Sequence, residues 1–245
     1  MSAPIFDDLL RQRRRARAAR TGGDRFLHDR AFDDCLDRLA DIRITITSAL
    51  IVGQADEKWT ASLAAILPGC IVAAATNDEV LHIAPASVDL CLSIGELETC
   101  VDLTTSAFTL RQLLVPGGLL LGAIVGGNSL PRLRAAMLAA DLAGGGATPR
   151  IHPSIDGPSL SALLGTVGFV EPVVDVDRLD VSYSNLDRLV EDLRAMGCTN
   201  ILAERSRRPL TRGQVATART AFLGDNDRVT ERFDLLHFAA WAPQP

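Results

Sequence analysis

The chain alternates between short apolar runs and longer segments whose apolar residues repeat every three or four positions. The longest run, residues 119–125, is apolar or glycine at every position, as expected of a strand covered on both faces. It follows a turn at Pro116-Gly117-Gly118, which neither a helix nor a central strand tolerates, and it ends at Gly126-Gly127. Asn128-Ser129-Leu130-Pro131 then begins a helix. A buried strand between two helices is typical of a layered α/β domain.

The same patterns predict the other elements of the chain. Strands are expected at 44–53, 71–75, 88–94, 173–183 and 233–241. Helices are expected at 6–20, 26–40, 59–67, 103–114, 130–142, 160–164, 185–196 and 211–223. Strands and helices alternate through the first half, which predicts a doubly wound and mostly parallel sheet.

Composition narrows the class of protein. A chain of 245 residues that is 47% hydrophobic can bury a large core, and it is too apolar to be disordered. The apolar run around Pro116 is interrupted, so no segment is expected to span a membrane. The amino terminus lacks the apolar core of a secretory signal, which predicts a cytoplasmic protein.

Cysteines and histidines give no sign of a metal site. The five cysteines are an odd number without C-x-x-C spacing, so they are expected to be buried, reduced thiols. The four histidines are scattered and no two stand at a ligand spacing, so we predict no bound metal.

Charge is distributed unevenly. Residues 1–30 carry eight arginines against four aspartates, a net charge of +4, whereas the whole chain carries −5. This basic arm could bind an anionic partner or fold over a pocket, or it could be an ordinary solvated helix. Its arginines Arg13, Arg14 and Arg15 have no aromatic residues among them, so there is no specific signal for nucleic acid.

Several blocks of sequence resemble a known family. They are V-D-L-C-L-S at 88–93, L-V-P-G-G-L-L-L-G-A at 114–123, G-G-N-S-L-P-R-L-R at 126–134 and E-D-L-R-A-M-G at 191–197. These blocks resemble the class I S-adenosylmethionine-dependent methyltransferases. The resemblance is strongest to bacterial relatives of the mitochondrial complex I assembly factor with this fold, which is an arginine hydroxylase and a cousin of the biotin-pathway carboxyl methyltransferase.

The resemblance implies a fold and a partner. It implies a seven-stranded, Rossmann-like sheet whose last strand is antiparallel, with 173–183 and 233–241 as the final pair. The chain would be one domain over 1–245. Its parts would be an N-terminal helical arm at 1–40, a core sheet at 41–183, a helical insertion at 184–225 and a C-terminal strand at 226–245. S-adenosylmethionine would bind at the carboxyl ends of the first strands, and a complex I subunit would be the protein partner or substrate.

The cofactor loop departs from the family pattern D-x-G-x-G-x-G. Ile51 stands at the acidic position, Gly53 is kept, and Ala55 and Glu57 replace the other two glycines. The strand at 71–75 ends without the acid that would accept hydrogen bonds from the ribose hydroxyls. By the resemblance Gly95 ends the fourth strand, and the stretch from Gly53 to Gly95 is short for both a second and a third strand with their helix before it. The loop motif is therefore eroded, and S-adenosylmethionine is a doubtful cofactor.

Candidate site residues follow from position in the predicted sheet. The cofactor-binding candidates, each of which could equally be part of a plain strand exit or loop, are Gly53, Gln54, Ala55, Asp78, Ser93, Ile94 and Gly95. The candidates on the substrate side are Asp102, Tyr183 and Asn185. Asp102 could instead cap a helix, and Tyr183 could be a buried tyrosine with a paired hydroxyl. No catalytic residue is identified.

Three functions remain open on this sequence. The first is a methyltransferase-like protein with a degenerate cofactor loop that acts in respiratory complex I assembly. The second is a non-catalytic assembly protein that has lost S-adenosylmethionine binding. The third is a protein-arginine hydroxylase on the same scaffold, because a fold alone does not fix the reaction.

Overall fold

The computed structural model describes residues 4–76 and 79–244, which fall into two compact units. Unit 1 holds the chain up to Arg25 together with Asn128–Ser154 and Arg178–Asp234. Unit 2 holds Phe26–Gly127, Ile155–Asp177 and the chain from Leu235 on. The division runs through two long strands, β5 (Val170–Tyr183) and β6 (Val229–Trp241). That the chain forms one domain with the predicted internal boundaries stays a prediction.

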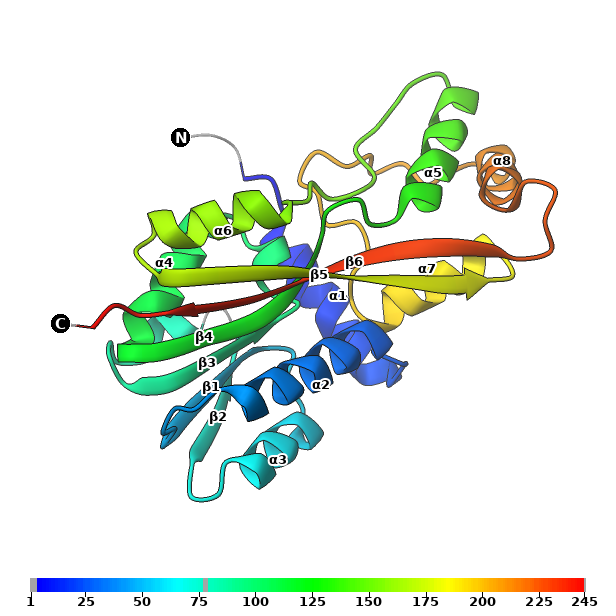
Figure 1. The fold of residues 1–245 in the computed structure, drawn as a ribbon. Coiled ribbons are helices and arrows are strands. Elements are labelled where there is room, and N and C mark those ends of the chain that lie inside the picture. The colour runs from blue at the N-terminus through cyan, green and yellow to red at the C-terminus, as the bar shows by residue number, and fades with distance from the viewer. Residues whose placement is uncertain (1–3, 77–78, 245) are drawn as a thin grey trace. The chain divides into compact units, whose positions relative to one another are not determined.

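A six-stranded sheet in the order β2-β1-β3-β4-β6-β5 confirms the α/β class within the described residues (Figure 1). The other strands are β1 (Ser48–Gly53), β2 (Ile71–Ala75), β3 (Val88–Ile94) and β4 (Leu114–Gly126). β1 pairs in parallel with β2 and β3, and β3 pairs in parallel with β4. β6 runs antiparallel to β4: the Gly117 amide donates to the Ala242 carbonyl at 3.1 Å, and the Ala242 amide donates to the Gly118 carbonyl at 2.8 Å.

The predicted seventh strand is not found among the described residues. β2 ends at Ala75 and β3 begins at Val88, and the connection between them contains the short 3-10 helix η1 (Glu79–His82). A parallel crossover alone needs a dozen or more residues, usually with a helix. The connection therefore has no room for a crossover helix and a further strand, and β2 lies at the edge of the sheet.

The turn predicted at 116–118 lies inside β4. The register between β3 and β4 moves from Val88 opposite Leu114 to Leu90 opposite Leu119, so β4 advances five residues where β3 advances two. The extra residues form an irregular bulge, and a proline in a bulge does not have to donate to the ladder. The strand therefore starts five residues earlier than the apolar run alone predicts.

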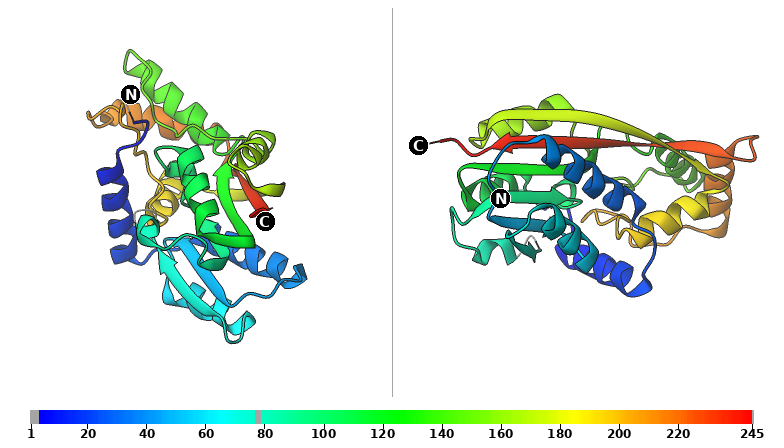
Figure 2. Two further views of the ribbon diagram at one scale, coloured as in Figure 1. Left: turned by 90° about the vertical axis from the view of Figure 1, so that its left-hand side faces the viewer. Right: turned by 60° about the horizontal axis from the view of Figure 1, so that its bottom comes forward.

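Unit 2 is layered around this sheet. Helices α2 (Phe26–Asp41) and α3 (Glu57–Ile66) lie together on one face and come forward in the right-hand view of Figure 2. Helices α4 (Leu103–Leu113) and α6 (Gly157–Thr166) pack on the other face. Along each strand alternate residues face opposite layers, so Leu50, Cys91 and Leu120 meet α4 and α6 in one buried cluster. The central strands β1, β3 and β4 are buried on both faces, as their solid apolar runs predict, whereas β2 and β5 are largely exposed.

Unit 1 contains four helices within the described residues: α1 (Asp8–Thr21), α5 (Pro131–Ala143), α7 (Leu186–Ala195) and α8 (Arg212–Leu223). Leu130, the residue before the first turn of α5, has a φ of 60° and supplies no side-chain cap. The carboxylate of Glu231 takes that role and accepts from the amides of Arg132 at 3.2 Å and Leu133 at 2.8 Å. An anion at a helix start satisfies free amides and complements the helix dipole. No helix of the described residues is both long and apolar enough to cross a membrane.

His152 in unit 1 makes stability depend on pH. Its Nε2 accepts a hydrogen bond from the Ile201 amide at 3.1 Å, and its ring meets Phe6 edge-on at 5.2 Å. Burial lowers the pKa of His152 from 6.5 to about 4, so below pH 6.5 the unfolded chain takes up a proton before the folded chain does. We expect the free energy of unfolding to be undiminished above pH 6.5 and to fall as the pH drops toward 4.

Urea unfolding at pH 7 and at pH 4.5 measures this effect. A His152→Gln variant keeps an acceptor for the Ile201 amide but cannot take up a proton, so its unfolding should depend less on pH. His237, whose pKa is also lowered by burial, adds a slope of the same sign in both proteins, and the difference between the proteins is the measure. Equal slopes for the two proteins would contradict the assignment.

Candidate functional site

Two glycines lie at the neighbouring carboxyl ends of β1 and β3. Gly53 has a φ of 138°, and a Cβ there would stand 2.6 Å from the carbonyl oxygen of Ile94. Gly95 has a φ of 67°, and its Cβ would stand 2.9 Å from Nε2 of His28. Neither position accepts a side chain without strain or a clash. This end of a parallel sheet is where open α/β folds bind their ligands.

The loop after β1 turns directly into α3. Gln54 and Ala55 are half-buried, and Asp56 caps the helix by accepting from the Trp59 amide at 3.0 Å. Ile51, at the position of the expected acid, is 0% exposed within the strand, whereas Glu57 is exposed in the first turn of α3. The loop therefore offers backbone groups to a ligand, and no carboxylate from the strand itself.

Helix α2 covers the same end of the sheet from one side. The rings of Phe32 and Trp59 stack with centroids 4.7 Å apart, and the Trp59 indole donates to Asp29 at 2.8 Å. His28 is 5% exposed and lies against Gly95. The sequence places these side chains on two predicted helices, 26–40 and 59–67, and assigns none of them to the site. The apolar faces of the two helices are the signal that they pack against the sheet.

Two polar side chains, Ser93 and Glu96, lie at the end of β3, and only Ser93 is among the candidates from the sequence. Ser93 is 0% exposed, and its Oγ has no hydrogen-bond partner within the described part of the chain. A buried hydroxyl without a partner costs free energy unless water or a ligand meets it. Glu96, which sequence reasoning passed over, is 1% exposed, and its Cγ lies 3.5 Å from the place of a Cβ on Gly53.

The acid Glu79 lies at the start of η1, shortly after the end of β2. The carboxylate of Glu79 accepts from the Thr76 amide at 2.7 Å and from the Thr76 hydroxyl at 2.9 Å. The hydrogen bond from the Thr76 amide lowers the pKa of Glu79, which is therefore ionised at neutral pH. Asp78, the predicted adenine-side candidate, lies outside the described residues.

The substrate-side candidates have structural partners. Asp102 caps α4 by accepting from the Thr105 amide at 3.1 Å and hydroxyl at 2.7 Å, and the hydroxyl bond lowers the pKa of Asp102. Tyr183 is 4% exposed and donates to Asp192 at 2.8 Å; burial, with Asp192 beside it, raises the pKa of Tyr183. Asn185 caps α7 through the Arg188 amide at 3.0 Å. Asp102 belongs to unit 2, whereas Tyr183 and Asn185 belong to unit 1.

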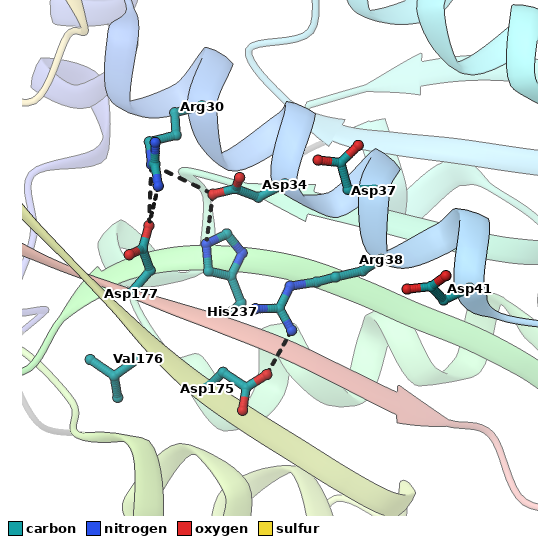
Figure 3. A pocket seen from close by; sticks show the side chains of 9 residues that line it. All are labelled: Arg30, Asp34, Asp37, Arg38, Asp41, Asp175, Val176, Asp177 and His237. Atoms are coloured by element: carbon teal, nitrogen blue, oxygen red, sulfur yellow. Dashed lines mark hydrogen bonds and ion pairs between the residues drawn. The ribbon is translucent and has the colours of Figure 1, made fainter.

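A separate charged pocket of about 420 Å³ lies within unit 2 (Figure 3). Its walls come from α2, β5 and β6, and they are formed by Arg30, Asp34, Asp37, Arg38, Asp41, Asp175, Val176, Asp177 and His237. Arg30 pairs with Asp177 at 2.9 Å and stands 3.7 Å from Asp34. Arg38 pairs with Asp175 at 2.6 Å. The pocket therefore mixes both signs of charge, with more acids than bases.

His237 forms the floor of this pocket. Its side chain is 1% exposed, and its Nε2 lies 3.4 Å from Oδ2 of Asp34. Neither ring nitrogen makes a hydrogen bond within the described residues. Burial, and then the charge of Arg38, lowers the pKa of His237, so the ring is neutral at pH 7. Sequence reasoning did not identify this pocket.

Curated proteins with similar sequences include O-methyltransferases and arginine hydroxylases. The chain is 35% identical to a malonyl-[acyl-carrier protein] O-methyltransferase of Xylella fastidiosa over 166 residues, 66% of this chain and 55% of that protein. It is 30% identical to the mitochondrial arginine-hydroxylase NDUFAF5 of Danio rerio over 178 residues, 71% of this chain and 54% of that protein. The chain thus spans about half the length of the relatives it matches. No family model matches it.

Solved structures agree on the fold. Phosphoethanolamine N-methyltransferase 2 of Haemonchus contortus, in complex with S-adenosyl-L-methionine, is similar with a TM-score of 0.50 at 15% identity, covering 86% of this chain and 53% of that one. The YcgJ protein of Bacillus subtilis gives a TM-score of 0.51 at 9% identity, and the match covers 89% of this chain and 100% of that one. At such identities the likeness concerns the fold.

Proposed function

Because this chain belongs to the class I S-adenosylmethionine-dependent methyltransferase superfamily, we propose that it binds S-adenosylmethionine at the carboxyl ends of β1 and β3. The observation that carries the proposal is the pair of glycines with positive φ, Gly53 and Gly95, at neighbouring strand ends. They leave the backbone without side chains at these strand ends, which is the side of an open α/β sheet where ligands bind. Gln54, Ala55, Ser93 and Ile94 would line the same space.

Two carboxylates fit the parts of the ligand that the eroded motif leaves without a partner. Glu96 reaches Gly53 from the end of β3, where it can replace the acid missing at Ile51. Glu79 stands at the end of β2, and its ionised carboxylate can accept hydrogen bonds from the ribose hydroxyls. When bound, the ligand supplies an activated methyl group. The chain's own groups would hold and orient it, and Ser93 would gain a partner for its buried hydroxyl.

The same geometry also supports a second candidate function, a non-catalytic assembly protein. His28 lies against Gly95, and Trp59 is held by Phe32 and Asp29, so side chains of α2 and α3 take up space at this end of the sheet. A protein that no longer binds the ligand would keep such a filled site. A protein partner or substrate, such as the complex I subunit that the family resemblance implies, is part of the proposal. Hydroxylation is a further alternative, because one of the relatives is named an arginine hydroxylase.

Isothermal titration of the full chain with S-adenosylmethionine distinguishes these functions. We expect saturable binding with one ligand per chain. Glu79→Gln should weaken it about tenfold, because a neutral amide is a poorer acceptor for two hydroxyl donors. The matched control is Glu191→Gln, an exposed acid of α7 paired with Arg188 in unit 1, which should leave the affinity unchanged. Absence of heat at millimolar ligand would reject the proposal in favour of the assembly protein.

A further inference from the structure

We propose that the pocket between α2, β5 and β6 binds one divalent transition-metal ion through Asp34, Asp177 and His237. One ligand atom from each of these residues lies within 4.8 Å of the other two. Metal–ligand bonds of about 2 Å bring such atoms roughly 3–4 Å apart, so side-chain movements of about 1–2 Å would close the site. Asp34 and Asp177 are each about one-third exposed, which leaves them free to make that movement.

The strongest argument for a ligand is the imidazole of His237. Its side chain is 1% exposed, and neither ring nitrogen has a hydrogen-bond partner within the described residues. In Figure 3 the ring projects from β6 between Asp34 and Arg38 into the space bounded by the acids. A buried polar group without a partner is unfavourable, and a metal ion on a ring nitrogen would satisfy it.

The charges around the pocket favour a cation. Its walls carry Asp34, Asp37, Asp41, Asp175 and Asp177 against Arg30 and Arg38, a net charge of −3 with the histidine neutral. A cleft with an excess of one sign concentrates ions of the other sign. Arg30 now bridges Asp34 and Asp177, but its side chain is 49% exposed and can turn toward solvent. Exposed ion pairs are weak, so a divalent ion can displace it.

The ligand set indicates which ions fit. Mg²⁺ and Ca²⁺ prefer oxygen ligands alone, whereas one imidazole nitrogen with two carboxylates suits Mn²⁺, Fe²⁺, Co²⁺ or Zn²⁺. Three protein ligands leave coordination positions open to water or to a small anionic molecule, as in catalytic metal sites. Structural ion pairs would explain Asp34 and Asp177 through Arg30, but they give the ring nitrogens of His237, 3.4 Å from Asp34 at the nearest, no hydrogen bond within the described residues.

Titration of the full chain with Co²⁺, followed by calorimetry and by the visible absorption of the ion, tests the site. We expect one ion per chain and a change of the Co²⁺ spectrum on nitrogen and carboxylate coordination. Asp34→Asn and Asp177→Asn should each weaken binding more than about tenfold, since a charged ligand is lost. The control is Asp41→Asn, a wall acid outside the three ligands, which should change the affinity less than about threefold, through long-range charge alone.

His237→Gln tests the buried ligand directly, with circular dichroism to establish that the variant is folded. Should this variant unfold, the two aspartate variants decide, because both positions are partly exposed. Zn²⁺ should also raise the midpoint of thermal unfolding of the wild-type chain and not that of Asp34→Asn. The proposal is overturned if Co²⁺ shows no saturable binding, or if Asp41→Asn weakens it as much as Asp34→Asn does. None of these measurements involves S-adenosylmethionine, so the result is independent of the proposed function.

Discussion

Replacing Glu231 by alanine is expected to lower the free energy of unfolding by about 3 kcal/mol, because buried amides at the start of α5 lose their acceptor. Glu231 is 0% exposed, and its two oxygens accept from the amides of Arg132, Leu133 and Arg232. Leu130 supplies no side-chain cap of its own, so the helix start has no substitute. Each unsatisfied buried donor costs about 1–3 kcal/mol.

Urea unfolding, followed by the circular dichroism of the helices, measures this change in the free energy of unfolding. Glu231→Gln is the matched variant, since it keeps one acceptor oxygen at the same distance from the backbone. Its free energy of unfolding should fall by about half as much as that of the alanine variant. If the alanine variant loses less than about 1 kcal/mol, the carboxylate is not the cap that the geometry indicates.

The second large effect is expected for Gly122→Ala in β4. A Cβ at this position would overlap the carbonyl oxygen of Ser93 and stand 2.6 Å from Cζ of Phe238. The carbonyl belongs to the paired strand β3, so it cannot turn away without moving the backbone. Overpacking of this kind lowers the free energy of unfolding by about 1–3 kcal/mol. Because the clash here is with the backbone, we expect Gly122→Ala to lower it by about 3 kcal/mol.

A second glycine of the same unit provides the control. Gly165 lies in helix α6, and a Cβ there would meet nothing within 4 Å. Gly165→Ala should therefore stabilise the protein by about 0.5–1 kcal/mol through helix propensity alone. Thermal unfolding of the two variants side by side should move their midpoints in opposite directions. A Gly122→Ala variant as stable as the wild type would show that β3 and β4 can separate locally at little cost.

The periodicity of apolar residues predicted most of the fold because local patterns dictate most of it. The strands β2 and β3 lie where their apolar runs place them, at 71–75 and 88–94. The early start of β4 was missed, because a bulge opposite Val88 accommodates Pro116 and depends on the partner strand rather than on the local sequence. The missing strand follows from a length already visible in the sequence, the short stretch between Gly53 and Gly95.

The sites were less predictable, because they depend on residues that are far apart in the chain. Glycine at a strand exit is a recognisable pattern, and it marks Gly53 and Gly95 as candidates whose part in binding stays a prediction. It could not identify Glu96 as a neighbour of Gly53, or His28 as a neighbour of Gly95. Asp34, Asp177 and His237 follow no ligand spacing, and only the packing of α2 against β5 and β6 brings them together.

The loss of a strand beyond β2 has a consequence for how the protein behaves when it is concentrated. β2 is the last strand on its side of the sheet, it carries no charged residue, and Ile71 at its start is 76% exposed. Natural sheets protect such rims with charge, proline or a covering segment, because an open ladder of amides and carbonyls accepts a strand from another molecule. The colloidal stability of this protein should therefore be limited by the open edge of β2.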